Sequence, residues 1–210
     1  MRIRRILSVL LVLVLVFACI PVSALANSPF ADVPEGHWAR SYILDAHAND
    51  IVRGDGTGHF RPSAHFLLAE AITILWNMEG RPISQIHAPP IYPPGRWYTD
   101  AALWAYEVGL ICRQFGTMHG LAHTITRQDL FMLKHNFADL VRNADVTPVP
   151  GANWPFPDHD QIDWWALPSV MWASGALNLQ GDENGNVNPL GTVNRAEAAI
   201  IIMRFLDWLD

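Results

Sequence analysis

Apolar residues recur at helical spacing in several short segments of the chain, and turn-forming residues separate these segments. In the segment from about residue 37 to residue 49, Ala39, Ile43 and Ala46 share one face. The same spacing predicts further helices over about residues 66–79 and 99–108, an apolar stripe through Leu130, Leu133, Phe137 and Leu140, and an apolar run over residues 198–209. The pattern therefore predicts an all-α protein built from short helices.

The first 26 residues have the composition of a secretory leader. Three arginines (Arg2, Arg4 and Arg5) precede an apolar run over residues 6–20, which is too short for a confident membrane span. Residues 24–26 (A-L-A) then fit the small-x-small rule for cleavage. We expect a signal peptide over residues 1–26 and a secreted protein without a membrane span.

Residues 181–197 predict a turn followed by a helix start. Glycine and asparagine residues in the first part favour backbone with positive φ, and Pro189 prevents a strand from continuing. Asn194 then lies three residues before Glu197, at the start of the last apolar run. This spacing is that of a capping box, with asparagine in place of serine or threonine.

Arg195 is the unusual residue of this helix start. A cation in the first turn faces the positive end of the helix dipole, at a cost of a few tenths of a kcal/mol. Two interpretations stay open at this point. The side chain either points to solvent or has a partner elsewhere, and an anionic ligand is one candidate for that partner.

The pattern of turn and helix start occurs three times. Aligning Pro62 with Pro189 brings Glu70 onto Glu197 without a gap, and the middle copy is T-R-Q-D over residues 126–129. The equivalent acids are Glu70, Asp129 and Glu197, so the copies are 59 (129 − 70) and 68 (197 − 129) residues apart. A period of this size is typical of arrays of supersecondary units, each too small to bury its own core.

Each copy also has a matching front half. Residues 30–33 (F-A-D-V) precede H-W-A at 37–39, residues 156–158 (F-P-D) precede W-W-A at 164–166, and the middle copy has W-Y at 97–98. In this order the motifs resemble the S-layer homology (SLH) domain, whose repeats carry an F-x-D-V start, a W-A helix, a G-x-x-x-G-x-F-x-P turn and a T-R-A-E helix start. The resemblance covers nearly everything after residue 29.

The resemblance divides the chain into a signal peptide over 1–26, repeat 1 over 27–82, a linker with repeat 2 over 83–146, and a linker with repeat 3 over 147–210. Two of the repeats depart from the pattern. Repeat 1 has L-L-A-E at 67–70, without the capping residue and the cation, and we interpret it as mainly structural there. Repeat 2 lacks the G-x-F-x-P turn in its loop over residues 112–125.

Charge narrows the range of partners. Loss of the three leader arginines changes Lys+Arg from 14 to 11 against 20 acids, so the net charge moves from −6 to −9. Such a surface argues against a nucleic-acid partner. Lys134 is the only lysine, so arginine carries nearly all the positive charge, and its fork suits a carboxylate.

Catalytic and metal-binding motifs are missing from the sequence. It contains no G-x-S-x-G, no H-E-x-x-H and no phosphate-binding glycine loop, which predicts neither an enzyme nor a cofactor. His119 and His123 have no obvious third ligand, so we predict no metal site. Three acids before the last W-W-A motif are interpreted as helix-start acids, namely Asp158, Asp160 and Asp163.

The resemblance implies three helix–loop–helix repeats in a pseudo-threefold arrangement around a central helical bundle. It also implies non-covalent anchoring to the bacterial cell wall or S-layer. Secondary cell-wall polysaccharide, often carrying ketal-pyruvate groups, binds such domains in grooves between repeats. A pyruvate carboxylate would pair with an arginine at a helix N-terminus, where backbone N–H groups also point outward. The matching residues are Arg127 and Arg195 for the anion, Trp38, Trp97 and Trp165 for stacking on sugars, and Asp32, Asp100 and Asp158 as hydroxyl acceptors.

Two alternatives stay open. A degenerate array could keep the fold and dock another envelope protein, in which case binding survives removal of the polysaccharide. A hydrolase of wall glycans with an unrecognised site would lose turnover on changing a single aspartate. For the anchoring hypothesis, we expect Arg195→Ala to weaken polymer binding by more than about 1 kcal/mol, with melting nearly unchanged.

Overall fold

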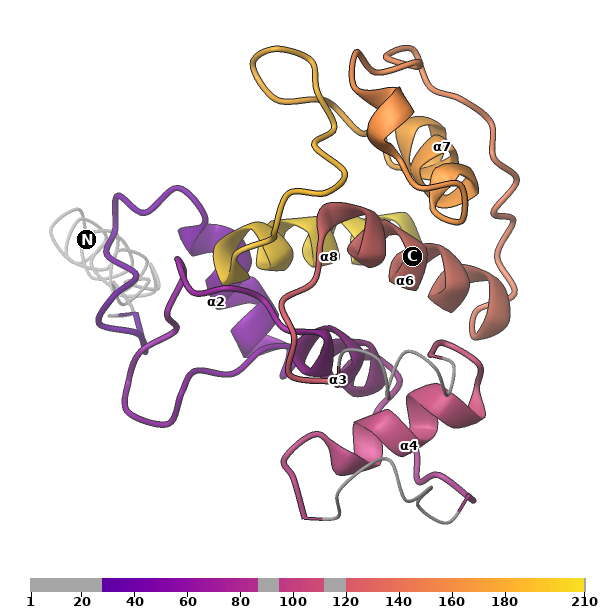
Figure 1. Cartoon of the computed structure of the whole chain (residues 1–210). Helices are drawn as coiled ribbons and strands as arrows, with labels where there is room; N and C mark the ends of the chain where they lie inside the picture. Colours follow the sequence, from indigo (N-terminus) through magenta and orange to yellow (C-terminus); the bar gives the residue numbers. More distant parts are fainter. Residues whose placement is uncertain (1–27, 87–94, 112–119, 210) are drawn as a thin grey trace, which may run out of the picture.

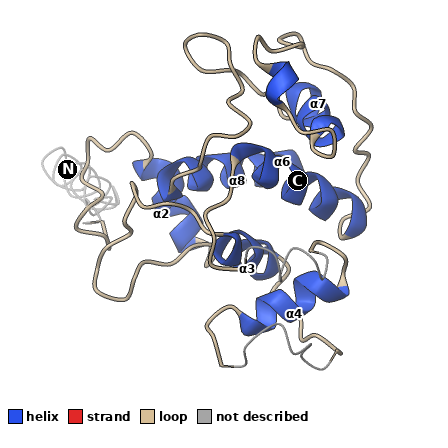
Figure 2. Cartoon of the chain, viewed as in Figure 1, coloured by secondary structure: helices blue, strands red, loops and turns tan. Residues whose placement is uncertain are grey.

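The computed structural model describes residues 28–86, 95–111 and 120–209, and the predicted leader and His119 lie outside these ranges. The described residues form helices and contain no β-strand (Figure 1 and Figure 2). The helices are α2 (Arg40–Ala48), α3 (Leu68–Met78), α4 (Thr99–Glu107), α6 (Arg127–Leu140), the short 3₁₀ helix η1 (His159–Gln161), α7 (Leu167–Ala176) and α8 (Arg195–Leu209). The prediction of an all-α fold is therefore confirmed.

Two of the helices begin at the predicted capping boxes. The N–H of Thr126 donates to the Asp129 carboxylate at 2.7 Å, and the N–H of Asp129 donates back to the threonine hydroxyl at 3.4 Å. Asn194 and Glu197 exchange the same pair of bonds, each at 2.9 Å. These bonds satisfy backbone groups that a helix end would otherwise leave unpaired, so the helix starts at α6 and α8 are set locally.

The helices pack in three pairs that join distant parts of the chain. α2 packs against α8, α4 against α3, and α7 against α6. In Figure 1 the helices α3, α6 and α8 lie in the middle, and α2, α4 and α7 lie outside them. Because α2 and α8 come from opposite ends of the described chain, their contact closes the arrangement into a cycle.

A closed ring of backbone hydrogen bonds joins the segments before the three central helices. The N–H of Phe66 donates to the carbonyl of Val193 at 2.8 Å, the N–H of Val193 to that of Ile125 at 3.3 Å, and the N–H of Ile125 to that of Phe66 at 3.1 Å. All three residues are buried. Each lies two residues before its helix, so the ring fixes the starts of α3, α6 and α8 relative to one another.

The first N–H groups of each central helix are satisfied by carbonyl groups of a distant loop. Residues 68 and 69 donate to His123 and Leu121, residues 127 and 128 donate to Gly191 and Pro189, and residues 195 and 196 donate to Ala64 and Pro62. The expectation that backbone N–H groups at these helix starts point outward to a ligand is therefore wrong. The fold uses them to hold neighbouring segments together.

Asp158 and Asp163 do not act as helix-start acids of α7, which begins only at Leu167. Asp158 directly precedes η1 but makes no side-chain capping bond to it, whereas Asp160 lies in the first turn of η1. Asp163 instead exchanges two bonds with the buried Gln128 of α6. The amide of Gln128 donates to the carboxylate at 2.7 Å and accepts from the N–H of Asp163 at 3.0 Å. This pair attaches the segment before α7 to the central helix α6.

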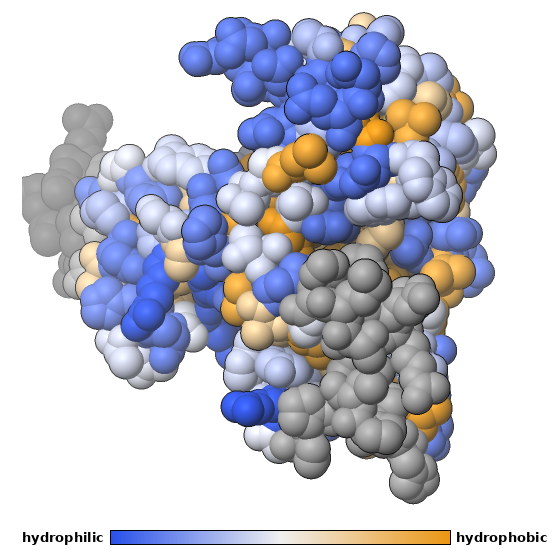
Figure 3. All heavy atoms as spheres, viewed as in Figure 1, coloured by the Kyte–Doolittle hydropathy of each residue, from blue (hydrophilic) through white to orange (hydrophobic). Residues whose placement is uncertain are grey.

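Buried aromatic and aliphatic side chains form a continuous core beneath this polar framework. Among the described residues, no helix has the length and apolar character needed to cross a bilayer. On the face shown in Figure 3, apolar atoms appear in separate small groups among polar ones. On this face no single apolar patch stands out, so we turn to the cavities of the described residues.

Candidate functional site

Asp32 and Asp158 hold the two equivalent turns that precede α3 and α8. The Asp32 carboxylate accepts the N–H groups of Phe60 at 2.8 Å and Arg61 at 2.7 Å. Asp158 accepts those of Val187 at 2.9 Å and Asn188 at 2.7 Å. In each case the second partner has left-handed backbone, with φ of 59° at position 61 and 51° at position 188. The F-x-D motif thus stabilises a turn conformation that costs energy without support.

The same contacts account for the electrostatics of Asp32. Burial opposes ionisation, but the N–H groups of Phe60 and Arg61 outweigh it and lower the pKa of this carboxyl below its ordinary value. Asp100 has no equivalent position. It is exposed in the first turn of α4, whereas Asp32 comes eight residues before α2. The structure therefore brings Asp100 into neither turn.

Asp158→Asn is expected to lower the free energy of unfolding by about 1 kcal/mol. An amide has one acceptor oxygen, so one of the two N–H groups, including that of the buried Val187, loses its partner. The measurement is urea denaturation, with Asp160→Asn as a matched control because that acid is exposed. Equal effects of the two changes would contradict the stabilising role of Asp158.

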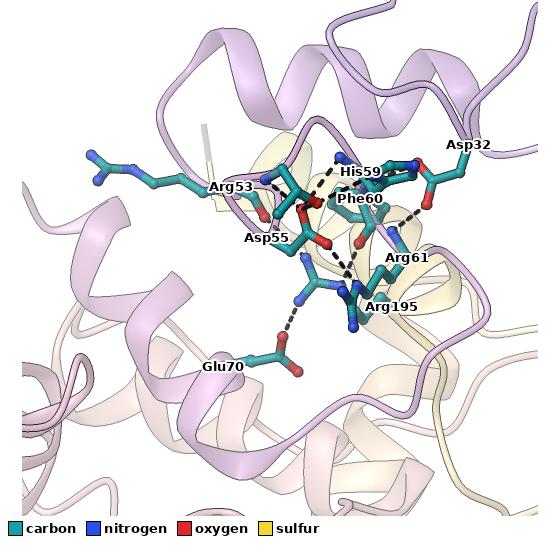
Figure 4. Close-up of polar contacts among 9 residues, drawn as sticks. Asp32, Arg53, Asp55, His59, Phe60, Arg61, Glu70 and Arg195 are labelled. Atoms are coloured by element: carbon teal, nitrogen blue, oxygen red, sulfur yellow. Dashed lines mark hydrogen bonds and ion pairs between the residues drawn. The ribbon is translucent and has the colours of Figure 1, made fainter.

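Arg195 points into the protein rather than into solvent (Figure 4). Its Nε donates to the carbonyl of Phe60 at 2.8 Å, one terminal nitrogen donates to the carbonyl of Arg53 at 2.9 Å, and the other pairs with the Glu70 carboxylate. The guanidinium also lies over the Phe60 ring, 4.6 Å from its centroid. Of the two interpretations from the sequence, the one with a partner elsewhere is right, and that partner belongs to the chain itself.

Glu70 is the link that local motifs did not reveal. One carboxylate oxygen accepts the N–H of Leu67 at 2.9 Å, so α3 keeps half of a capping box without a capping side chain. The other oxygen pairs with Arg195, which is 125 residues away in sequence. Nearby, Arg61 pairs with Asp55 at 2.7 Å, and hydrogen bonds from Thr57 and then Arg61 lower the pKa of Asp55.

Arg127 makes one of the equivalent contacts but lacks the ion pair. Its Nε donates to the carbonyl of Val187 at 2.7 Å, and its guanidinium lies 6.0 Å from the Phe131 ring centroid. Within the described residues, Arg127 forms no salt bridge, although Glu197 lies close enough to favour its charge. Burial lowers the pKa of both Arg127 and Arg195, yet a guanidinium stays protonated at neutral pH.

Two cavities each combine one of these arginines with one of the predicted tryptophans. A cavity of about 790 Å³, here named the Arg195 groove, is lined by Arg195, Glu70 and Trp97 among others. A cavity of about 560 Å³, the Arg127 groove, is lined by Arg127, Trp38 and Lys134 among others. Trp97 and Trp38 are 62% and 61% exposed, so each presents much of its indole to solvent in a groove that also contains an arginine. One face of Trp38 stacks on the ring of His37.

The remaining predicted site residues lie outside these two grooves. Trp165 is half-buried against the core, and Asp32, Asp100 and Asp158 line neither cavity. Conversely, sequence reasoning did not single out Glu70, Tyr42 or Lys134 as groove residues. Within the described ranges, no group of three or more histidine, cysteine or acidic side chains is placed to hold a metal ion. The geometry therefore describes a helical protein with two arginine–tryptophan grooves.

Comparison with known proteins identifies a domain family in two segments of the chain. The sequence model of the S-layer homology domain matches residues 29–72 and 155–199. The first segment contains Asp32, Trp38 and Glu70, and the second contains Asp158 and Arg195. The two outer repeats proposed from the motifs are therefore recognised independently, and the match leaves out the segment that holds Trp97 and Arg127.

Similar curated proteins are surface-layer proteins of bacteria, which agrees with the cell-surface location predicted from the sequence. The chain is 27% identical over 188 residues to the S-layer protein sap of Bacillus anthracis, which is 88% of this chain and 22% of that protein. It is 27% identical over 187 residues to an S-layer protein of Bacillus thuringiensis subsp. finitimus, with the same shares. A shorter match, 41% over 70 residues, is to the surface-layer 125 kDa protein of Lysinibacillus sphaericus. The chain thus spans about a fifth of the length of the first two relatives.

Proposed function

We propose that this chain is a non-enzymatic, secreted protein that anchors non-covalently to the bacterial cell wall by binding its secondary polysaccharide. The observation that carries the proposal is the pairing of an arginine with an exposed tryptophan in two separate cavities. A guanidinium recognises a carboxylate through charge-assisted hydrogen bonds, such as that of a pyruvylated sugar. The indole face supplies an apolar surface for a sugar ring.

We further propose that the chain contains three tandem repeats in a pseudo-threefold arrangement, with bounds of 27–82, 83–146 and 147–210. Three observations support this organisation. The helix pairs form a cycle, the ring through Phe66, Ile125 and Val193 closes on itself, and each central helix receives carbonyls from the next loop in that cycle. The two grooves are then equivalent sites, since each takes its arginine and its tryptophan from different repeats.

The test is a pull-down of the purified protein with cell-wall sacculi, before and after acid extraction of the secondary polymer. We expect binding to native sacculi and loss of binding after extraction. Failure to bind native sacculi would overturn the anchoring proposal. Binding that survives extraction would favour a protein partner instead.

Docking of another envelope protein is the second candidate function. One observation favours it, because Arg195 already has Glu70 as its counter-charge and therefore has less to gain from an anionic polymer. In that case the Arg195 groove, which also presents Trp97, would receive a side chain of the partner.

Trp38→Ala and Trp97→Ala are each expected to weaken sacculus binding by roughly tenfold, because aromatic contacts dominate many binding interfaces. Both side chains are mostly exposed, so stability should change by less than about 0.5 kcal/mol. Binding isotherms on sacculi and thermal melting give the two readouts. Trp164→Ala is the matched control, since Trp164 is 85% exposed and lines neither groove. A loss for Trp164→Ala equal to the others would argue against the grooves.

A further inference from the structure

Lys134, the only lysine of the chain, occupies a core position of α6. It lies five residues after Asp129, and the equivalent positions after Glu70 and Glu197 are the buried aliphatic residues Leu75 and Ile202. The side chain of Lys134 is itself buried, with the residue 2% exposed. A basic side chain therefore occupies a core position of α6 that is apolar in α3 and α8.

The ammonium group has aromatic neighbours but no counter-charge in the described part of the chain. Its nitrogen lies 4.8 Å from the ring centroid of Phe131 and 5.7 Å from that of Phe205. No salt bridge or hydrogen bond of Lys134 is present among the described residues. Burial, and then the charge of Arg127, lower the pKa of Lys134 to about 7. A buried ammonium in this state gains more from an anion than a solvated one does.

Lys134 lines the Arg127 groove, where the charges are unbalanced. Besides Lys134, the charged residues of the lining are Arg127 from α6 and Arg204 and Glu197 from α8. The remaining lining residues, from the segment at Trp38, α2, α6, α8 and residues 177–181, carry no charge at neutral pH. Glu197 already accepts the N–H of Asn194 through one oxygen. The lining therefore holds three basic side chains and one carboxylate, while Asp158 and Asp182, outside the lining, also favour the charge of Arg127.

The Arg195 groove is different, because its half-buried arginine already has a counter-charge. Glu70 neutralises Arg195 and Asp55 neutralises Arg61, whereas the two other arginines of the lining, Arg53 and Arg81, are exposed to solvent. The two grooves thus share an arginine and an exposed tryptophan but differ in net charge at the arginine. Only the Arg127 groove would offer an anionic group a buried basic side chain that has no salt bridge among the described residues.

We propose that Lys134 and Arg127 form an anion subsite in the Arg127 groove, which takes the carboxylate of an acidic sugar while Trp38 contacts the ring. The choice of a sugar acid rests on the proposed function, and the two-cation subsite rests on the burial and contacts of Lys134. The proposal makes the grooves unequal, with the Arg127 groove selecting the anionic unit of the polymer. It also makes binding depend on the protonation of one amine, so affinity falls as the pH rises through neutrality.

The single lysine allows a direct test. Protein labelled with ¹³Cε-lysine gives one lysine signal, whose titration reports Lys134 alone. We expect glucuronate to raise the midpoint of this titration by about one pH unit, which corresponds to roughly tenfold tighter binding to the charged form, and glucose to leave it unchanged. An unchanged midpoint with saturating glucuronate would overturn the proposal, as would an equal shift with glucose. A shift with glucose 1-phosphate and none with glucuronate would overturn the assignment to a carboxylate.

Variants separate this proposal from the anchoring function. Lys134→Met should lose at least about tenfold in glucuronate affinity and in sacculus binding, whereas Arg142→Gln, which removes a charge just after α6 and outside both grooves, should lose neither. If the unmodified protein and Lys134→Met bind sacculi equally, the subsite is wrong and anchoring stands. If glucuronate shifts the lysine titration but no form binds sacculi, the subsite stands and anchoring fails. If the variant does not fold, the lysine titration of the unmodified protein still tests whether Lys134 takes part in an anion subsite.

Discussion

Replacing Arg195 by alanine is expected to lower the free energy of unfolding by about 3 kcal/mol. The change removes two bonds to the carbonyls of Phe60 and Arg53 and leaves the mostly buried Glu70 carboxylate without its counter-charge. Sequence alone predicts that this variant melts almost normally and loses only polymer binding. The contacts of Arg195 revise that expectation, because they join the start of α8 to the loop before α3. Equilibrium denaturation in urea measures the effect.

Arg127→Ala provides the matched control for this prediction. Arg127 makes the equivalent bond to a backbone carbonyl but has no ion pair among the described residues, so its loss should be about 1 kcal/mol. A double-mutant cycle of Arg195→Ala with Glu70→Gln should give a coupling energy above about 1 kcal/mol. A smaller loss for Arg195→Ala than for Arg127→Ala would contradict the role of the ion pair.

The parts of the fold that could be predicted from the sequence are those fixed by contacts between residues close together in the chain. The bonds of Thr126 with Asp129 and of Asn194 with Glu197 span three residues, so their spacing predicts the starts of α6 and α8. α3 begins without a capping side chain, and the N–H of Glu70 donates to the carbonyl of Leu67 instead. Loop carbonyls accept the first two N–H groups of α3, as they do at α6 and α8. Those bonds depend on the tertiary fold and have no local signal.

The candidate site was harder to predict, because its pairings cross the chain. The bond of Asp32 to the turn at Phe60 spans 28 residues, and the bond of Arg195 to Glu70 spans 125. A motif match identifies such residues but does not say whether they bind a ligand or one another. Asp32 and Asp158 illustrate the difference, since both were predicted as hydroxyl acceptors and both hold turns through backbone N–H groups.

Lys134 is a residue for which the sequence did carry a signal. It lies four residues after Leu130 and three before Phe137, which places it on the same helix face as the predicted apolar stripe. A charge within such a stripe indicates either a long side chain that reaches solvent or a buried group with a function. Its 2% exposure excludes the first of these, and its place in the Arg127 groove supports the second.

The stability of the protein is expected to rise by about 3 kcal/mol between pH 7 and about pH 9.5, through Lys134. The pKa of this group is about 7 in the folded protein, against 10.5 for an ordinary lysine. Between these two values the unfolded chain binds the proton that the folded protein has released, so raising the pH favours folding. Below pH 7 both states are charged, and the folded protein bears the full cost of burying the ammonium. Urea denaturation at a series of pH values measures the slope.

Lys134→Met should remove this rise and stabilise the protein at pH 7 by about 2 kcal/mol, because an unbranched apolar side chain takes the place of an unpaired buried charge. Arg142→Gln, two residues after the end of α6, should keep the rise, since its charge lies outside the core. A pH dependence that persists in Lys134→Met would assign it to another group. If the methionine variant is more stable and binds the acidic sugar less well, the lysine lowers stability in the free protein and serves the ligand. Leu75 in α3 and Ile202 in α8 would then stabilise the core, whereas the equivalent residue of α6, Lys134, would serve ligand binding.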